Sequence, residues 1–377
     1  MSLEYKYINS EGEFATFYET IKLQKVLAVD LEADSMHHFK EKVCLIQITG
    51  AEKSCVLDPL KLNDFSKLKT LLEDKNIQKV FHGSDFDIRS LDREYKIRVN
   101  NLFDTEIACK FLGTKERGLA ALLKKYFNVI QDKRFQKKDW SQRPLPEEMI
   151  SYSIVDVLYL IELAQILKKK LKEKNRLEWA EEEFERQTEV RYKNNAGVYR
   201  FLKFKGAGKM DRQTLGVLEG LLVMREKLAE LKDLPLFKVM GAGEIKNIAL
   251  AKPLTLQHLQ KISVLSKRQF NMYGKQCIDA ITKAMELKRD DLPKYPKTKT
   301  FRLNNIEQQR IKQLKKMREK KGEELMMEHG FLINNALITK IAVKNPLTKE
   351  ALEKIQPIRK WQIDALLDDI LNILHNC

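Results

Sequence analysis

The second half of the chain contains an internal repeat, and this feature limits most strongly the folds that the chain can adopt. The tetrapeptide Met224–Lys227 recurs 93 positions later as Met317–Lys320, and the tripeptide Pro253–Thr255 recurs at the same spacing as Pro346–Thr348. Several apolar positions keep this spacing without a gap, and strand signals stop after about residue 205. The sequence therefore predicts two copies of one small all-helical domain.

The first half of the chain alternates short apolar runs with amphipathic helical patterns. The apolar runs predict strands at Val26–Leu31, Val43–Ile48, Cys55–Leu57 and Val80–Phe81. Helical spacing of apolar residues predicts helices at Phe65–Leu72, Asp85–Tyr95, Leu119–Phe127 and, as one long element, from about Pro146 to Lys174. We expect an α/β domain over residues 1–205, then helical domains at 208–287 and 303–377, joined by a proline- and lysine-containing linker at 290–300.

The composition favours a protein that binds a polyanion. The 377 residues include 69 Lys and Arg against 53 Asp and Glu, which gives a net charge of +16 and a pI near 9.4. A basic protein of this kind most often binds nucleic acid. The hydrophobic residues, 43% of the chain, form no apolar run of about 18 residues, so we expect no membrane-spanning helix. We also expect no secretory signal.

The cysteines and one glycine-rich segment exclude other classes of site. The cysteines are far apart and form no CxxC pair, which disfavours a zinc ribbon or a disulfide framework and favours a reducing cytoplasm; they are Cys44, Cys55, Cys109, Cys277 and Cys377. The segment Gly206–Lys209 is no phosphate-binding loop, because Lys203 and Met210 stand where that pattern requires Gly and Ser or Thr. We therefore expect a cytoplasmic protein without a nucleotide cofactor.

Two pairs of polar residues interrupt apolar segments of the α/β region. Asp30 and Glu32 lie two apart on a predicted strand, so their carboxylates project from one face. Tyr152 and Asp156 lie four apart on a predicted helix, so they share a face one turn apart. Taken alone, the first pair also fits a strand end in solvent, and the second fits a buried tyrosine beside a salt-bridged aspartate.

A further acid follows the predicted strand at Val80–Phe81. Asp87 lies in the first turn of the helix that follows this strand, and Asp85 is a competing candidate that also fits a helix cap. Asp87 together with the acids described above makes a set of hard oxygen ligands, which suits two Mg²⁺ or Mn²⁺ ions better than zinc. Two such ions clamp the attacking and leaving oxygens of phosphoryl transfer. A basic protein with this set is a candidate nuclease.

The acidic segments resemble the Exo I, II and III motifs of the DEDD 3′→5′ exonucleases. Val29–Glu32 is similar to Exo I, His82–Ile88 to Exo II, and Tyr152–Asp156 to the Tyr-x-x-x-Asp form of Exo III. Ser151 stands where the other subclass has its histidine, so the chain resembles the tyrosine subclass. Phe103–Thr105 and Asp139–Leu145 resemble further signatures of the ribonuclease D group, and the two repeats resemble HRDC domains.

This resemblance implies a fold and an activity. The implied fold is α/β: a ribonuclease-H-like mixed-sheet exonuclease domain, followed by two all-α HRDC bundles. The implied activity is 3′→5′ exoribonuclease action on RNA with a free 3′ end, such as tRNA precursors, which releases nucleoside 5′-monophosphates. The implied ligands of two Mg²⁺ or Mn²⁺ ions are Asp30, Glu32, Asp87 and Asp156. Tyr152 would orient the attacking water.

Two alternatives remain open at this point. One is a DNA 3′→5′ exonuclease of the same superfamily, because no residue reveals a preference for a terminal ribose 2′-hydroxyl. The other is a non-catalytic RNA-binding scaffold, which would have no need to keep the full set of acids. The sequence indicates no membrane and no obligate protein partner.

Several other residues are candidates for contact with the substrate. They are His37, His38, His82, Lys137, Trp140 and Arg143. The first three lie close in sequence to the Exo I and Exo II acids. Lys137 and Trp140 belong to a basic segment with interleaved aromatic rings, a pattern typical of single-strand binding, and Arg143 lies in the Asp139–Leu145 signature. Solvated loop histidines, a structural His82 and a plain solvated basic face are the competing interpretations. For Asp104 we expect a helix N-cap.

Overall fold

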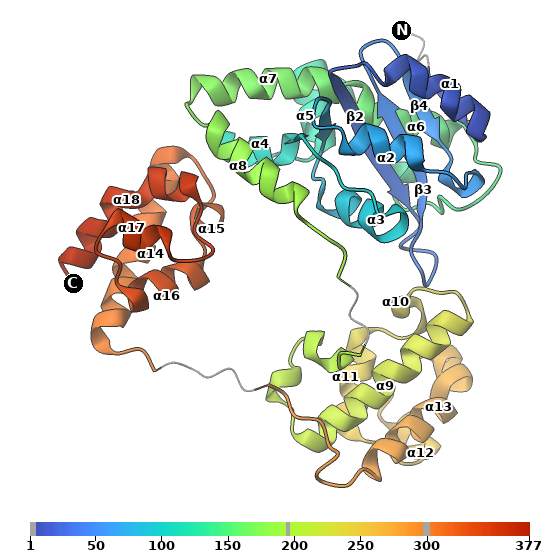
Figure 1. Cartoon of the computed structure of the whole chain (residues 1–377). Coiled ribbons are helices and arrows are strands. Elements are labelled where there is room, and N and C mark those ends of the chain that lie inside the picture. The colour runs from blue at the N-terminus through green and yellow to red at the C-terminus, as the bar shows by residue number, and fades with distance from the viewer. Residues whose placement is uncertain (1–4, 194–196, 297–301) are drawn as a thin grey trace. The chain divides into compact units, whose positions relative to one another are not determined.

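The strands predicted in the first half of the chain form part of one mixed sheet. In the computed structural model, which describes residues 5–193, 197–296 and 302–377, six strands lie in the order β1-β4-β3-β2-β5-β6 (Figure 1). Their bounds are β1 Lys6–Ile8, β2 Val26–Ala33, β3 Val43–Thr49, β4 Ser54–Leu57, β5 Gln78–Phe81 and β6 Leu102–Asp104. The mixed-sheet α/β prediction is confirmed. The prediction missed β1 and β6, because a strand of three residues is too short to show a period.

The acids of β2 lie on the half of the strand that has a neighbour on one side only. β2 pairs with β3 in antiparallel and with β5 in parallel orientation, but its pairing with β5 covers only Val26–Ala28. The second half of β2, with Asp30 and Glu32, therefore extends beyond the end of β5. The register with β3 shifts between Glu32 and Ala33, which is an irregularity of the kind often found beside functional sites.

Eight helices of the described residues belong to the sheet domain. They are α1 Glu11–Ile21, α2 Ser66–Glu73, α3 Asp85–Tyr95, α4 Thr105–Leu112, α5 Leu119–Phe127, α6 Glu147–Leu158, α7 Leu160–Glu173 and α8 Leu177–Thr188, with short 3-10 turns at η1 Pro59–Lys61 and η2 Lys133–Phe135. The helix predicted as one element from Pro146 to Lys174 is interrupted at Tyr159. The interruption lets α6 pack on β2, β3 and β4, while α7 packs on β2, β5 and α4.

The predicted repeat is present as two copies of a helical domain. The first consists of η3 Arg200–Lys203, η4 Ala207–Lys209, α9 Arg212–Leu231, α10 Leu236–Val239, α11 Ala242–Ala251, α12 Leu256–Lys261 and α13 Lys267–Met285. The second consists of α14 Asn305–Leu325, α15 His329–Leu332, α16 Asn335–Lys344, α17 Lys349–Glu353 and α18 Lys360–His375. Equivalent contacts recur 93 positions apart: Arg225 donates to the carbonyl of Met240, and Arg318 donates to the carbonyl of Ile333.

The chain divides into two compact units, and each repeat belongs to a different one. The first unit contains residues 5–33, 43–192 and 302–377, so the second repeat packs with the sheet domain. The contact is an aromatic cluster in which the Phe111 ring lies 5.0 Å from both Phe331 and Trp361, and Trp361 lies 6.0 Å from Trp179. One hydrophobic core therefore runs through the α/β domain and the second repeat.

The second unit contains the first repeat and a short excursion from the sheet. Residues 34–42, between β2 and β3, belong to it together with 193 and 197–296. Asp233 holds this excursion: its carboxylate lies 2.7 Å from Nδ1 of His38 and accepts from the backbone N–H of Phe39 at 3.1 Å. Phe39 packs against the apolar core of the first repeat. Of the predicted 290–300 linker, residues 297–300 lie outside the described residues.

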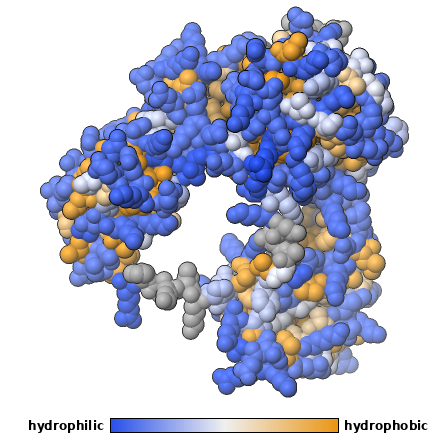
Figure 2. Space-filling model, in the orientation of Figure 1, coloured by the Kyte–Doolittle hydropathy of each residue, from blue (hydrophilic) through white to orange (hydrophobic). Residues whose placement is uncertain are grey.

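The face of each unit that Figure 2 presents is mainly polar, as the charge of the chain implies. Figure 2 shows hydrophilic side chains over most of the face of each unit that it presents. One described helical span, Glu147–Glu173, is long and apolar enough to cross a membrane. It comprises α6 and α7, 56% of its apolar window is buried, and its packing on the sheet accounts for its composition.

Candidate active site

Three carboxylates from two elements meet beside the second half of β2, which extends beyond β5. Asp30 and Glu32 project from one face of the strand, as their spacing predicts, and Asp156 reaches them from α6. One carboxylate oxygen of each residue lies within 4.8 Å of one oxygen of the other two. Residues that are far apart in the sequence thus form one acidic cluster.

The acids of this cluster are shielded from water, and their negative charges repel one another. Burial raises the pKa of Asp30 to about 7. Burial also raises the pKa of Glu32 well above its ordinary value, and the charges of Asp30, Asp156 and Asp87 raise it further. The pKa of Asp156 is raised by burial and then by Asp30. In this site the charged form of each carboxylate is unfavourable unless a cation binds beside it.

Asp87 is the acid that α3 contributes. It is 5% exposed and lies in the first turn of α3. Burial raises its pKa well above the ordinary value, and the charge of Asp30 raises it next. Asp85, the competing candidate, is exposed and is paired with Arg89 at 2.8 Å. The structure thus favours Asp87 over Asp85 as the acid that faces the cluster.

Tyr152 lies one helical turn before Asp156, in an aromatic setting. The tyrosine is 8% exposed, and its ring lies 5.5 Å from Phe135 and stacks on Trp140 at 6.2 Å. Its hydroxyl hydrogen-bonds with Gln131 and Gln136, and burial raises its pKa to about 12. Because it stays protonated at neutral pH, this hydroxyl acts as a hydrogen-bonding group and not as a base.

Gln131 is a site residue that the sequence analysis missed. Its side-chain amide donates to a carboxylate oxygen of Asp156 and also engages the hydroxyl of Tyr152. It therefore joins the two Exo III residues. The segment before Trp140 contains no periodic pattern, so no sequence signal marks Gln131 beforehand.

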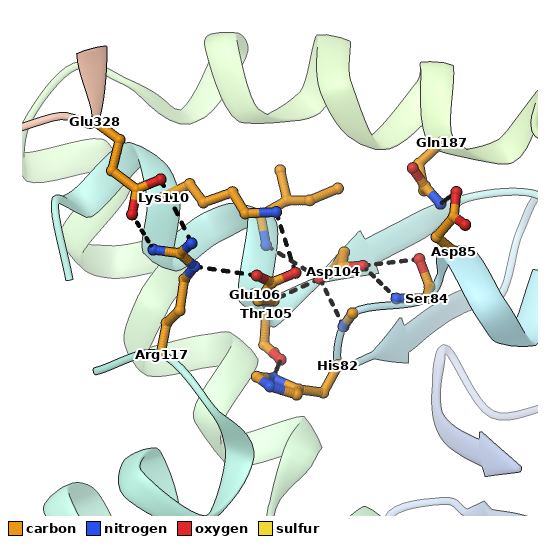
Figure 3. A network of polar contacts seen from close by, with 12 residues as sticks. His82, Ser84, Asp85, Asp104, Thr105, Glu106, Lys110, Arg117, Gln187 and Glu328 are labelled. Carbon is orange, nitrogen blue, oxygen red and sulfur yellow. Dashed lines mark hydrogen bonds and ion pairs between the residues drawn. The ribbon is translucent and has the colours of Figure 1, made fainter. Parts of the chain in front are cut away.

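Asp104 supports the turn that carries Asp87. Its carboxylate is 1% exposed and accepts from the backbone N–H groups of Gly83 at 3.1 Å and Ser84 at 2.8 Å, and from the Ser84 hydroxyl at 2.7 Å (Figure 3). It also accepts from the N–H of Glu106 at 2.8 Å, which confirms the predicted N-cap of α4. Gly83 has a φ of +70°, so the turn needs both a glycine and this acceptor.

Two predicted substrate contacts are corrected by their burial and their partners. Trp140 is 1% exposed, so its ring supports Tyr152 and presents no face to RNA. The Arg143 guanidinium forms a two-point ion pair with Asp58, at 2.6 and 2.7 Å, and Asp58 is fully buried. Arg143 also donates to the carbonyl of Cys44 at 2.8 Å. It ties this segment to the sheet.

The remaining predicted substrate contacts lie in different places. Nδ1 of His82 lies 2.8 Å from the Thr105 hydroxyl, beside the Asp104 turn. His37 and His38 lie on the excursion that belongs to the second unit, where His38 meets Asp233. Lys137 is exposed in the loop before Trp140. Contact of any of these residues with RNA stays a prediction.

The donor set fits hard divalent cations. Carboxylate oxygens are the ligands that Mg²⁺ and Mn²⁺ prefer. The charges that act most strongly on Glu32 are those of three other acids, so the cluster lacks a balancing charge among its strongest neighbours. Asp30, Glu32 and Asp156 would hold such ions directly, and Asp87 would complete the set.

Comparisons with known proteins show what the two parts of the chain are similar to. Residues 5–172 match the 3′-5′ exonuclease family, and residues 214–281 and 307–374 each match the HRDC domain. Ribonuclease D of Desulfotalea psychrophila is 29% identical over 325 residues, which cover 85% of this chain and 86% of that protein. The chain is therefore similar to ribonuclease D over most of its length, with a 3′-5′ exonuclease domain followed by two HRDC domains.

Other relatives of this ribonuclease D homologue share the exonuclease part or the whole fold. Protein RRP6-like 3 of Arabidopsis thaliana is 39% identical over 174 residues, which are 46% of this chain and 20% of the plant protein. The crystal structure of Escherichia coli RNase D superposes with a TM-score of 0.76 at 22% identity over 99% of both chains. The chain thus shares the fold of a bacterial ribonuclease D, with its exonuclease domain followed by the HRDC region.

Proposed function

We propose that this chain hydrolyses the 3′-terminal phosphodiester of RNA and releases nucleoside 5′-monophosphates, with two divalent cations held by Asp30, Glu32, Asp87 and Asp156. The observation that carries the proposal is the meeting of three carboxylates within 4.8 Å beside Tyr152. When bound, the cations supply activation of a water molecule and neutralise charge on the leaving 3′ oxygen.

The residues of the chain orient the reactants. Tyr152 stays protonated, so its hydroxyl positions the attacking water by hydrogen bonding. Gln131 hydrogen-bonds with both Tyr152 and Asp156, so it fixes the position of the Tyr152 hydroxyl relative to the acids. The Asp104 carboxylate fixes the turn from which Asp87 projects. Burial of these groups favours their interaction with cations, because the local dielectric is low.

We propose structured RNAs, such as tRNA precursors with extended 3′ ends, as the substrates. The support is similarity: the Escherichia coli enzyme is described as an exoribonuclease involved in structured RNA processing. We also propose a cytoplasmic location and the domain boundaries 1–205, 208–287 and 303–377. The five cysteines are free thiols, which agrees with a reducing compartment.

One assay tests the activity and its alternatives. A 3′-tailed RNA and a DNA of the same sequence are incubated with the protein and Mg²⁺ or Mn²⁺, and the products are identified by chromatography. We expect nucleoside 5′-monophosphates from RNA. Faster degradation of DNA would favour the DNA exonuclease, and binding of RNA without degradation would favour the scaffold. A tRNA precursor with a 3′ extension, compared with an unstructured RNA, tests the substrate class.

A further inference from the structure

A cavity with charged side chains in its lining lies beside the acidic cluster, within the first unit. Its volume is about 730 Å³, and the side-chain charges of its lining are three cations, Lys115, Arg117 and Lys124, against two acids, Glu116 and Glu328. Ile130 and Gln131 also line it. We call it the Lys115 pocket. It is built from the α4–α5 connection, from α5, from the segment after α5, and from one residue of the second HRDC domain.

Gln131 links this pocket to the acids. The same side chain that lines the Lys115 pocket donates to Asp156 and engages Tyr152. The pocket therefore begins one side chain away from the cluster where the terminal phosphodiester reacts. An RNA strand whose 3′ end lies at Asp156 carries its next phosphates at regular intervals away from that point, and this pocket lies beside its start.

The chemistry of the lining suits a nucleic acid backbone. Lys115 and Lys124 are exposed cations on flexible stems, so they can reach a phosphate without leaving a buried charge behind. Ile130 is 83% exposed, so it offers an apolar surface in the lining of the pocket. Cations beside an apolar surface are the combination that single-stranded nucleic acids use, with charge for phosphates and apolar contact for sugars or bases.

Arg117 is the third cation of the pocket, and two acids engage it. Its Nε donates to Glu106 at 3.0 Å, and its Nη1 donates to Glu328 at 2.6 Å (Figure 3). Glu106 lies on α4, next to the Asp104 turn, whereas Glu328 belongs to the second HRDC domain and its side chain is 60% exposed. The Glu328 carboxylate therefore stands where a phosphate would meet the guanidinium fork.

We infer that the Lys115 pocket binds successive backbone phosphates of the RNA just upstream of its 3′ end, and that Arg117 exchanges Glu328 for one of these phosphates. The inference rests on the proposed exoribonuclease function and deepens it, because it assigns the strand a path from the cluster toward the second HRDC domain. An exposed carboxylate is a weak competitor, because water and salt screen its ion pair and the pair must hold two long side chains in one geometry.

Removal of positive charge from the pocket should weaken RNA binding, and removal of negative charge should strengthen it. The double variant Lys115→Gln/Lys124→Gln removes two phosphate contacts, and Glu328→Gln removes the competitor. The control is Lys25→Gln/Lys53→Gln, which removes two exposed lysines that directly precede β2 and β4 and do not line the pocket. Melting temperatures check that all variants are folded.

The measurement is binding of a 3′-tailed RNA without divalent metal, by fluorescence anisotropy across a salt series. Loss of two phosphate contacts should flatten the slope of log affinity against log salt by about 1.4 for a single strand. Glu328→Gln should bind several-fold more tightly than the parent at low salt. A double variant with the slope of its control, or a Glu328→Gln variant that binds no more tightly, would overturn the inference.

Failure of the pocket and failure of the enzyme are distinguishable. If the parent protein degrades no RNA in Mg²⁺ or Mn²⁺, the proposed function fails whatever the binding data show. If the parent degrades RNA while the pocket variants bind it like their control, the function stands and the pocket assignment falls.

Discussion

The indole N–H of Trp361 donates to the carboxylate of Glu183 at 2.8 Å, and this bond joins the second HRDC domain to α8 of the exonuclease domain. The same carboxylate accepts from Arg359 at 3.0 Å. Glu182 accepts from the backbone N–H groups of Lys360 and Trp361, each at 2.9 Å, and so caps α18 from outside. The second repeat is thus anchored by polar contacts as well as by its aromatic core.

The first prediction concerns this anchor. Trp361→Ala should lower the free energy of unfolding of the first unit by about 3–5 kcal/mol, because it opens a cavity against Phe111. The control is Leu254→Ala, which removes an exposed apolar side chain of the first repeat and should cost little. Urea unfolding followed by circular dichroism measures both variants. Equal, small losses would show that the second repeat does not stabilise the exonuclease domain.

The second prediction concerns Asp30. Asp30→Asn should abolish cleavage of RNA while the fold persists, because it removes one negative ligand from a site that needs them. The rate of nucleotide release in Mg²⁺ measures the effect, and the melting temperature checks the fold. A purified variant that retains more than about a tenth of the parent rate would exclude Asp30 as a direct metal ligand.

The third prediction separates the two Exo III residues. Tyr152→Phe should slow cleavage by roughly 10²-fold, because a positioned hydrogen-bonding group is lost, but it should leave Mn²⁺ binding intact. Asp156→Asn should weaken Mn²⁺ binding as well. Calorimetric titration with Mn²⁺ compares the two variants, and an equal loss of metal binding in both would refute this division of roles.

The fourth prediction concerns Asp104. Asp104→Asn keeps a side chain that can cap α4 but removes a carboxylate that accepts from Gly83 and Ser84. Metal affinity or activity should fall on the order of 10- to 100-fold, as is typical of residues that hold a metal ligand in place. Asp85→Asn, which alters an exposed acid on the same helix as Asp87, is the control. Mn²⁺ titration of both variants gives the comparison; indistinguishable affinities would assign Asp104 to helix capping alone.

The spacing of residues within one strand or one helix is sufficient to predict much of this site. It does not predict contacts between segments that are far apart in the sequence. Asp30 and Glu32 share a face because strand side chains alternate, and Tyr152 and Asp156 share one because of the helical turn. Neither rule predicts that Gln131 reaches Asp156, since that contact depends on how the loop after α5 folds back. The prediction for Trp140 is wrong for the same reason: a ring in a basic segment suggests a surface, and only the packing against Tyr152 shows that it is buried.

The division of the repeats could not be predicted from the sequence either. The two copies are similar enough to share the bond from Arg225 or Arg318 to an equivalent carbonyl. Only the second copy carries Trp361 and Phe331, which meet Phe111 of the exonuclease domain. Its association with the sheet domain therefore depends on residues outside the repeated pattern.

The last prediction concerns pH and the acidic cluster. The pKa of Asp30 is about 7 in the folded chain, above its ordinary value of 3.8, so the folded state binds the proton more tightly than the unfolded state does. The stability that this proton contributes is fully present below pH 3.8 and is lost as the pH rises toward about 7. Without divalent metal, the melting temperature should therefore decrease as the pH rises from 5 to 7.5, because the proton on Asp30 is lost. Mn²⁺ should restore it at pH 7.5, because an ion that binds only the folded state stabilises that state. Asp30→Asn should reduce both the fall and the recovery, and a variant that kept both at the parent's size would show that another group is responsible.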